Sequence, residues 1–428
     1  MPMQIRRDRS ALHYGRRSRR RGAFWFFLVW LMSMAIVLAI VWRFNAVQAQ
    51  VTGFVSGPST STPDAVSLAT RADEAYWQGD LATAIDFYTQ AAELEPNDVG
   101  IHFEYVRVLV YGSYEGRGFR FRAEHALEVG EDIANRQPNS ALARAAHALA
   151  LIENGRADEG AAEALRATEL APGWAEAHAY LSLAYRAQDR WRLAQEEAQK
   201  AVELDGMSVD ARRALALSLA FTGQWQLAIS QYEQAIQIHP RLDALYFELV
   251  PYYTIQDNYD AAIQALDRVL ANNPRNVKAW TRKCETYFRQ RDDNNAQEAC
   301  EQAIELDATF PEAHRQLGMV RYTRRNYEGA IESFEECVAL MDAQNWPMVD
   351  RLEQCYYIQG LAYHLLDNCA EAMPLFRQAL LVDLSEAGAG LTVDGMNLCA
   401  RDDESFSAED IPTPPPPTPS PPPPIGIY

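Results

Sequence analysis

GQWQLAISQYEQAIQIHP (residues 223–240) decides how this chain folds, because its spacing of residue types recurs elsewhere in the sequence. Counted from Gly223, the stretch places an aromatic residue at Trp225, a small residue at Ala228 and a proline at Pro240. None of these side chains is an obvious catalyst. The recurrence therefore indicates an architectural unit that is used many times.

The small residue of this stretch recurs with a period of 34 residues. A period of 34 is the length of two helices joined by a turn. Small residues are needed where the two helices approach each other closely, and a proline ends the second helix. The small residue lies at Gly160, Ala194, Ala228, Ala262, Ala296 and Ala330, and, across two steps of 42, at Ala84, Ala126 and Ala372. Terminating prolines lie at Pro96, Pro138, Pro172, Pro240 and Pro274.

This pattern closely resembles the tetratricopeptide repeat family over residues 65–386. The resemblance implies an all-α fold, a right-handed α-solenoid in which neighbouring hairpins bury each other's apolar faces. Gly206, Ala308, Asp342 and Leu384 depart from the pattern, because a proline is common at their position. We expect nine units, which begin near residues 65, 99, 141, 175, 209, 243, 277, 311 and 353.

A membrane-spanning helix is expected before the repeats. Residues 23–42 read AFWFFLVWLMSMAIVLAIVW and carry no charge. Twenty helical residues cover about 30 Å, the thickness of the hydrocarbon core of a bilayer. Residues 1–22 contain eight arginines, which predicts a cytoplasmic N-terminus and an extracytoplasmic body, as for a protein of the bacterial cell membrane. A cleaved secretion signal is the alternative, although the apolar run is longer than such signals usually are.

The remaining segments are a linker at 43–64, an acidic tail at 387–411 and a proline-rich tail at 412–428. We expect the proline-rich tail to be disordered. The proline-rich tail favours polyproline II and suits a spacer better than a ligand for an aromatic groove. Beyond residue 22 the chain has 31 basic and 57 acidic residues, so its body would repel the phosphates of a nucleic acid. Nucleic acid is therefore not an expected partner.

Two eight-residue insertions interrupt the period. The first, within VLVYGSYEGRGFRFRAEHAL (108–127), lies between the two helices of the second unit. Its glycines and aromatics predict an extended turn that is structural or contacts a partner, because a phosphate-binding loop would need a preceding strand or a following lysine. The second insertion surrounds NWPMVDRL (345–352) and separates the last two units.

Six cysteines lie in the last third of the chain, at Cys284, Cys300, Cys337, Cys355, Cys369 and Cys399. An oxidising compartment would allow disulfides. Facing positions within a hairpin make 284–300 plausible, and the simplest full set adds 337–355 and 369–399. Buried free thiols are the alternative. A metal site is not expected, because no CxxC pair or Cys/His cluster has the spacing of metal ligands.

The family resemblance implies that the first helix of each unit lines a concave groove that binds a peptide or protein. The matching positions are apolar or aromatic with interspersed arginines, which suits an apolar segment with some acidic charge. Leu217, Pro251 and Met319 replace the asparagine of the family's carboxylate clamp, so that clamp is not expected. The expected groove residues are Phe103, Arg107, Arg186, Arg213, Leu217, Phe221, Phe247, Lys278, Phe288, Arg315 and Tyr322.

These features favour a membrane-anchored extracytoplasmic scaffold for protein–protein interaction, in envelope assembly or secretion. We identify no catalytic residue, cofactor, metal site or small-molecule substrate, because none of the nucleophile, phosphate-loop or zinc-protease motifs is present. Two alternatives stay open. One is an envelope enzyme or carbohydrate-binding surface protein that uses the groove and the first insertion, and the other is a structural spacer.

Overall fold

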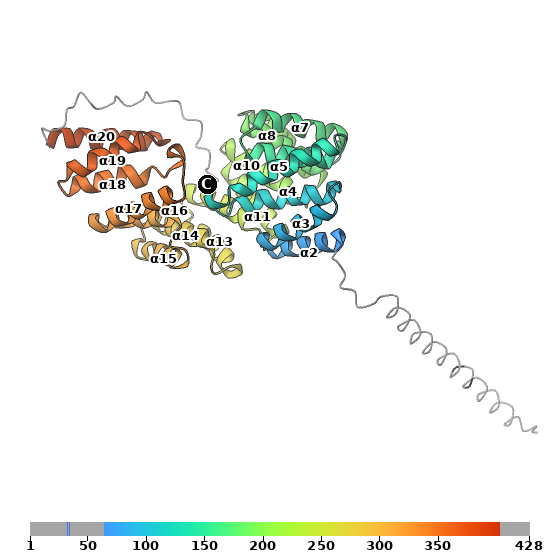
Figure 1. The fold of residues 1–428 in the computed structure, drawn as a ribbon, viewed down its shortest axis with the longest axis horizontal. Helices are drawn as coiled ribbons and strands as arrows, with labels where there is room; N and C mark the ends of the chain where they lie inside the picture. Colours follow the sequence, from blue (N-terminus) through green and yellow to red (C-terminus); the bar gives the residue numbers. More distant parts are fainter. Residues whose placement is uncertain (1–31, 33, 35–63, 403–428) are drawn as a thin grey trace, which may run out of the picture. The chain divides into compact units, whose positions relative to one another are not determined.

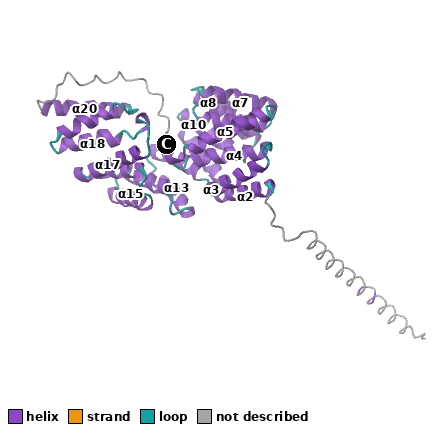
Figure 2. Cartoon of the chain, in the orientation of Figure 1, coloured by secondary structure: helices purple, strands orange, loops and turns teal. Residues whose placement is uncertain are grey.

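The computed structural model describes Met32, Met34 and residues 64–402, without the side chain of Arg117. Figure 2 shows that residues 64–402 form helices joined by short loops, with no strand in this part of the chain. The prediction of an all-α solenoid of helix hairpins is therefore confirmed for these residues. No helix within the described residues is long and apolar enough to cross a membrane. The expected span at 23–42 lies outside the described residues, apart from Met32 and Met34.

The helices of residues 64–386 form nine consecutive antiparallel pairs, which follow one another in chain order (Figure 1). The first helices begin within one residue of the expected unit starts. They are α2 (Ala65–Gln78), α4 (Val99–Ser113), α6 (Ala141–Glu153), α8 (Ala175–Ala187), α10 (Val209–Phe221), α12 (Asp243–Ile255), α14 (Val277–Arg289), α16 (Pro311–Thr323) and α18 (Gln354–Leu365). The second helices are α3 (Leu81–Leu94), α5 (Phe121–Arg136), α7 (Ala157–Leu170), α9 (Trp191–Leu204), α11 (Trp225–Ile238), α13 (Tyr259–Asn272), α15 (Asp293–Leu306), α17 (Tyr327–Ala343) and α19 (Cys369–Ala379).

One residue with a positive φ angle sits in the turn inside most hairpins. In the stretch 223–240 this residue is Gly223, with φ 77°, two residues before the start of α11. Glycine adopts this left-handed conformation without the steric cost that a Cβ imposes. The equivalent turns of other units hold Asp189, Asp257, Arg291, Arg325 and Asp367, all with positive φ. The turn geometry is therefore conserved along the chain even where glycine is not used.

The apolar core of the described residues falls into three clusters. The largest runs without interruption from Ala65 to Ala279. A small cluster surrounds Cys284 and Cys300, and a third extends from Ala330 to Cys399. The core is therefore continuous up to the start of α14 and divided into two smaller clusters after it.

The two insertions and the end of the array have distinct structures. The first insertion continues α4 to Ser113 and then forms a short 3₁₀ helix, Arg117–Phe119, before α5. The second insertion lengthens α17 and adds a 3₁₀ helix at Met348–Asp350. The segment expected to be an acidic tail begins instead with a further helix, α20 (Glu386–Asp402). Its buried Thr392, Met396 and Cys399 explain why this part folds.

Three disulfides join the six cysteines in the simplest full set of pairs expected from the sequence, of which only 284–300 followed from the facing positions of a hairpin. Cys284–Cys300 links the two helices of one hairpin, α14 and α15. Cys337–Cys355 links α17 to α18, across the second insertion. Cys369–Cys399 links α19 to α20 and so attaches the last helix to the final hairpin.

Candidate functional site

The expected groove residues differ in exposure according to their position along the first helices. Those in the first two turns are buried at Phe103 on α4, Arg213 on α10, Phe247 on α12 and Lys278 on α14, and half-buried at Arg315 on α16. Those in the last turn remain half-buried. We call the first group the inner face and the second group the rim. The rim comprises Arg186, Phe221, Phe288 and Tyr322.

A buried ion pair connects α10 and α12 on the inner face. The Arg213 guanidinium donates to both carboxylate oxygens of Glu248, with distances of 2.7 and 3.0 Å, and only 2% of Arg213 is exposed. A carboxylate so close to a buried guanidinium keeps the positive charge paired. Burial is the largest influence and alone would lower the pKa of Arg213, but Glu248, Tyr114, Tyr111 and Glu153 together outweigh it and raise the pKa. This arginine is therefore occupied by the protein itself.

A second ion pair connects α4 and α10. Arg107 lies 3.2 Å from the Asp210 carboxylate and 2.5 Å from that of Glu104. The other oxygen of Asp210 accepts a hydrogen bond of 2.6 Å from the hydroxyl of Tyr111. Residues about 100 positions apart in the chain are joined here, so the inner face of unit 2 is held against that of unit 5.

The first insertion covers the inner face. The hydroxyl of Tyr114 accepts a hydrogen bond of 2.8 Å from Arg213, and its backbone carbonyl accepts one from the Lys278 ammonium. Lys278 also lies 4.9 Å above the ring of Phe247. Burial, assisted by the nearby Arg282, lowers the pKa of Lys278 to about 7. The segment that the sequence predicted to be a structural or partner-contacting turn thus contacts two expected groove residues, Arg213 and Lys278.

Arg315 on α16 is half-buried, and its Nε atom has no hydrogen-bond partner among the described residues. It lies near Glu285, whose carboxylate is bound by Arg282 at 2.9 Å and Arg289 at 3.1 Å. Burial opposes ionisation of Glu285, but Arg282, Arg315 and Arg289 outweigh it and lower its pKa to about 2. The buried Nε atoms of Arg315 and of Arg186 on the rim have no hydrogen-bond partner among the described residues. The Nε atom of Arg107 also lacks a partner within the described part of the chain, but its other nitrogens already pair with Glu104 and Asp210, which leaves Arg186 and Arg315 for an acidic ligand.

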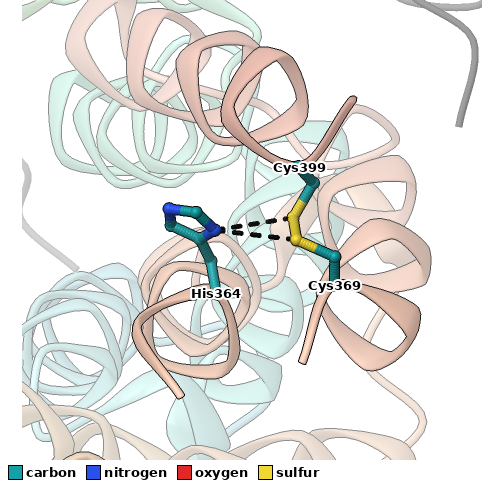
Figure 3. A group of neighbouring side chains, drawn as sticks. All are labelled: His364, Cys369 and Cys399. Atoms are coloured by element: carbon teal, nitrogen blue, oxygen red, sulfur yellow. Dashed lines mark hydrogen bonds between the residues drawn. A yellow bond between two sulfur atoms is a disulfide. The ribbon is translucent and has the colours of Figure 1, made fainter. Parts of the chain in front are cut away.

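A histidine and two cysteines meet near the end of the array, as Figure 3 shows. The Nδ1 atom of His364 lies 3.6 Å from the sulfur of Cys369 and 3.8 Å from that of Cys399. The two sulfurs are bonded to each other. Zinc binds thiolates, and a disulfide sulfur is not one, so this group does not form a metal centre while the disulfide is intact.

Sequence reasoning missed the acidic partners and the tyrosines that occupy the inner face. Asp210 and Glu248 are buried, although each lies in a helix with long apolar runs, VDARRALALSLAF and DALYFELVPYYTI. A charged residue within such a run is a usable signal, because a buried charge needs a partner. Tyr111 and Tyr114 carry no comparable signal, because their contacts depend on the curvature of the array.

Two segments of the chain match family models for the tetratricopeptide repeat. The matched residues are 181–243 and 253–319. Within these segments lie α10 and α14, which contribute Arg213 and Lys278 to the inner face. The chain therefore contains tetratricopeptide repeats, as the residue pattern predicted.

Similar proteins align over a limited part of the chain. Hsp70–Hsp90 organizing protein 1 of Glycine max is 25% identical over 100 residues, which are 23% of this chain and 17% of that protein. RNA polymerase II-associated protein 3 of Xenopus laevis is 28% identical over 102 residues, 24% of this chain and 15% of that protein. These alignments span about a sixth of the relatives' length. Among solved structures, a chain of the APC/C hetero-tetramer Cut9–Hcn1 aligns with a TM-score of 0.47 and 14% identity, covering 85% of this chain and 82% of that one.

Proposed function

We propose that this protein is a scaffold that binds an extended segment of a partner protein along its rim. The observation that carries the proposal is the partial exposure of three aromatic side chains and an arginine in the last turn of α8, α10, α14 and α16. Aromatic residues and arginine are the side chains that most often dominate protein interfaces. The matched tetratricopeptide repeats, and the similarity of one segment to an Hsp70–Hsp90 organizing protein, support the same class of function.

The partner segment is apolar or aromatic and carries carboxylates. Phe221, Phe288 and Tyr322 offer apolar contact, while the Nε atoms of Arg186 and Arg315 are buried and lack a partner among the described residues. A guanidinium binds a carboxylate through two parallel hydrogen bonds, so each arginine can orient one acidic group. The net charge of −19 repels such a segment at long range, so its binding would depend on short-range contacts with these two arginines.

We propose that the scaffold is anchored in a bacterial cell membrane by residues 23–42 and works on the extracytoplasmic side. The arginines before the apolar run and its length support this orientation. Three disulfides also suit an oxidising compartment. The process that such a scaffold serves would be envelope assembly or secretion.

Photocrosslinking in intact cells tests the proposed rim. A photoreactive amino acid at Phe288 is expected to give a discrete adduct with another protein, identified by mass spectrometry. The matched control position is Leu227, an exposed residue on the second helix α11. Discrete adducts at Phe288 that disappear in an Arg186→Ala, Arg315→Ala variant support the proposal. No adduct at Phe288, or the same adducts at both positions, would favour the spacer interpretation.

A further inference from the structure

The first insertion reaches helices that are far from it in the chain. Tyr114 contacts α10 through Arg213 and α14 through Lys278. Gly116 lies against the ring of Phe310, directly before α16. The insertion therefore crosses the inner face from unit 2 to units 5, 7 and 8, instead of projecting away from the array.

The insertion is held in one shape by α5. Arg122 donates a hydrogen bond of 2.9 Å to the carbonyl of Gly112 and forms an ion pair of 2.8 Å with Glu115. The same guanidinium lies 4.4 Å above the ring of Phe119. A segment fixed in this way loses little further conformational entropy when it fills the inner face.

The insertion supplies uncharged hydrogen-bond partners to polar groups of the inner face, of which Arg213 and Asp210 already have their charges paired. Glu248 already neutralises Arg213, and Asp210 already neutralises Arg107. The insertion provides hydrogen-bond partners for a nitrogen of Arg213, an oxygen of Asp210 and the Lys278 ammonium. Tyr111 and Tyr114 supply two hydroxyls and one backbone carbonyl to them, and no charge. An acidic segment from outside would place a second carboxylate where the charges are already balanced.

We infer that residues 111–119 are an internal ligand that closes the inner face between α10 and α14 to segments of other proteins. A partner protein would then contact the rim. The inner face would instead hold units that are distant in the chain in a fixed arrangement. This inference concerns the chain alone and does not depend on the proposed partner.

Lysine acylation reports directly on this closure, because the chain has only three lysines, Lys200, Lys278 and Lys283. Lys200 is exposed and serves as the internal reference, while 8% of Lys278 is exposed. In the intact protein at pH 8, acetylation of Lys278 by a water-soluble succinimidyl ester should be roughly 50-fold or more slower than that of Lys200, because it requires local opening. A lysine with a lowered pKa is a strong nucleophile when it is accessible, so slow labelling reflects closure. Equal rates at the two lysines would overturn the inference.

Two variants identify the insertion as the cause of the protection. Replacing residues 114–120 with TGQ, the linker of residues 222–224, should raise the acetylation rate of Lys278 to about that of Lys200. If this variant loses its helical circular dichroism, Tyr114→Ala keeps the segment length and should accelerate Lys278 roughly tenfold. Phe121→Ala is the matched control, since this neighbouring ring is 58% exposed and should leave the rate unchanged. A folded Tyr114→Ala protein with a protected Lys278 would contradict the inference.

Discussion

The helices before and after α14 are stabilised in different ways. From α2 to α13 one apolar cluster runs through the units, and buried ion pairs join α4 to α10 and α10 to α12. From α14 to α20 the core divides into two smaller clusters, of which one contains one disulfide and the other contains two. The first region thus depends on long-range polar contacts, and the second on covalent links between neighbouring helices.

The difference shows how a repeat array can limit its own flexibility. Units of a solenoid normally contact only their neighbours, so its curvature is set by small local rotations. Contacts between units 2 and 5 remove that freedom in the first region. In the second region a disulfide stabilises a hairpin mainly by restricting the unfolded chain. The two regions should therefore respond to different perturbations.

The largest effect is expected from breaking the buried pair of the first region. Arg213→Ala leaves the Glu248 carboxylate buried without its partner, which should cost about 3 to 5 kcal/mol of unfolding free energy. Urea titration followed by hydrogen exchange of α10 and α12 measures the loss. The exposed pair of Arg192 with Glu196 provides the control, because Arg192→Ala should change little. Replacing both partners, with Arg213→Met and Glu248→Leu, should recover most of the loss. Equal losses in the single and double variants would show that packing matters and the charge does not.

Acid should weaken the first region through His239. Its Nε2 atom lies 3.1 Å from the carbonyl oxygen of Tyr76, its ring stacks on Trp77, and its Nδ1 atom has no partner among the described residues. Burial lowers the pKa of His239 from about 6.5 to about 4. The unfolded chain therefore binds a proton at a higher pH than the folded one, and stability falls as pH falls from 6.5 to 4, by about 3 kcal/mol.

The difference between the wild type and His239→Gln isolates this dependence. Asp243 acts in the opposite sense, because burial raises its pKa to about 7, but it is present in both proteins. The difference in unfolding free energy between them should change with pH only between about 4 and 6.5. Hydrogen exchange should place the change in α2 and the loop before α12. A difference that is constant with pH would mean that His239 has the same pKa in the folded and the unfolded states.

The second region should be sensitive to the loss of a disulfide. Cys337→Ala with Cys355→Ala opens a link between residues 18 positions apart, which should cost about 2 to 3 kcal/mol. Hydrogen exchange should increase in α17 and α18 and stay unchanged in α4 and α10. A reducing agent should have the same regional effect on the wild type. Faster exchange in α4 would show that the two regions are coupled.

The repeating hairpins could be predicted from the sequence, but the contacts by which the first insertion covers the inner face could not. Small residues at a fixed period predicted the hairpins, because close helix packing depends on side-chain size and is encoded locally. The pairing of Cys284 with Cys300 followed from the same register. The contacts of Tyr114 with Arg213 and Lys278 depend on the summed rotation of several units, which no local pattern carries. The expected groove residues on the rim remain a prediction.

The positions of Cys284 and Cys300 within their repeat allow a direct comparison of how the two regions fill the space between paired helices. The equivalent positions hold Gly318 facing the ring of Phe334 in the next unit, and the buried Ala216 and Tyr232 in unit 5. One small and one large residue thus fill the space that the disulfide fills between α14 and α15.

Two replacements at these positions separate packing from the covalent link. Cys284→Ala with Cys300→Ala removes both the link and buried volume, and should cost roughly 3 kcal/mol or more. Cys284→Ala with Cys300→Tyr restores the pair used in unit 5 and should recover about 1 kcal/mol of that loss, since the ring refills the cavity. Thermal unfolding under reducing conditions gives the packing contribution alone, because the wild type then also lacks the link. If the tyrosine variant is the less stable of the two, the local spacing of α14 and α15 has been set by the disulfide, and this unit differs from its neighbours in backbone as well as in chemistry.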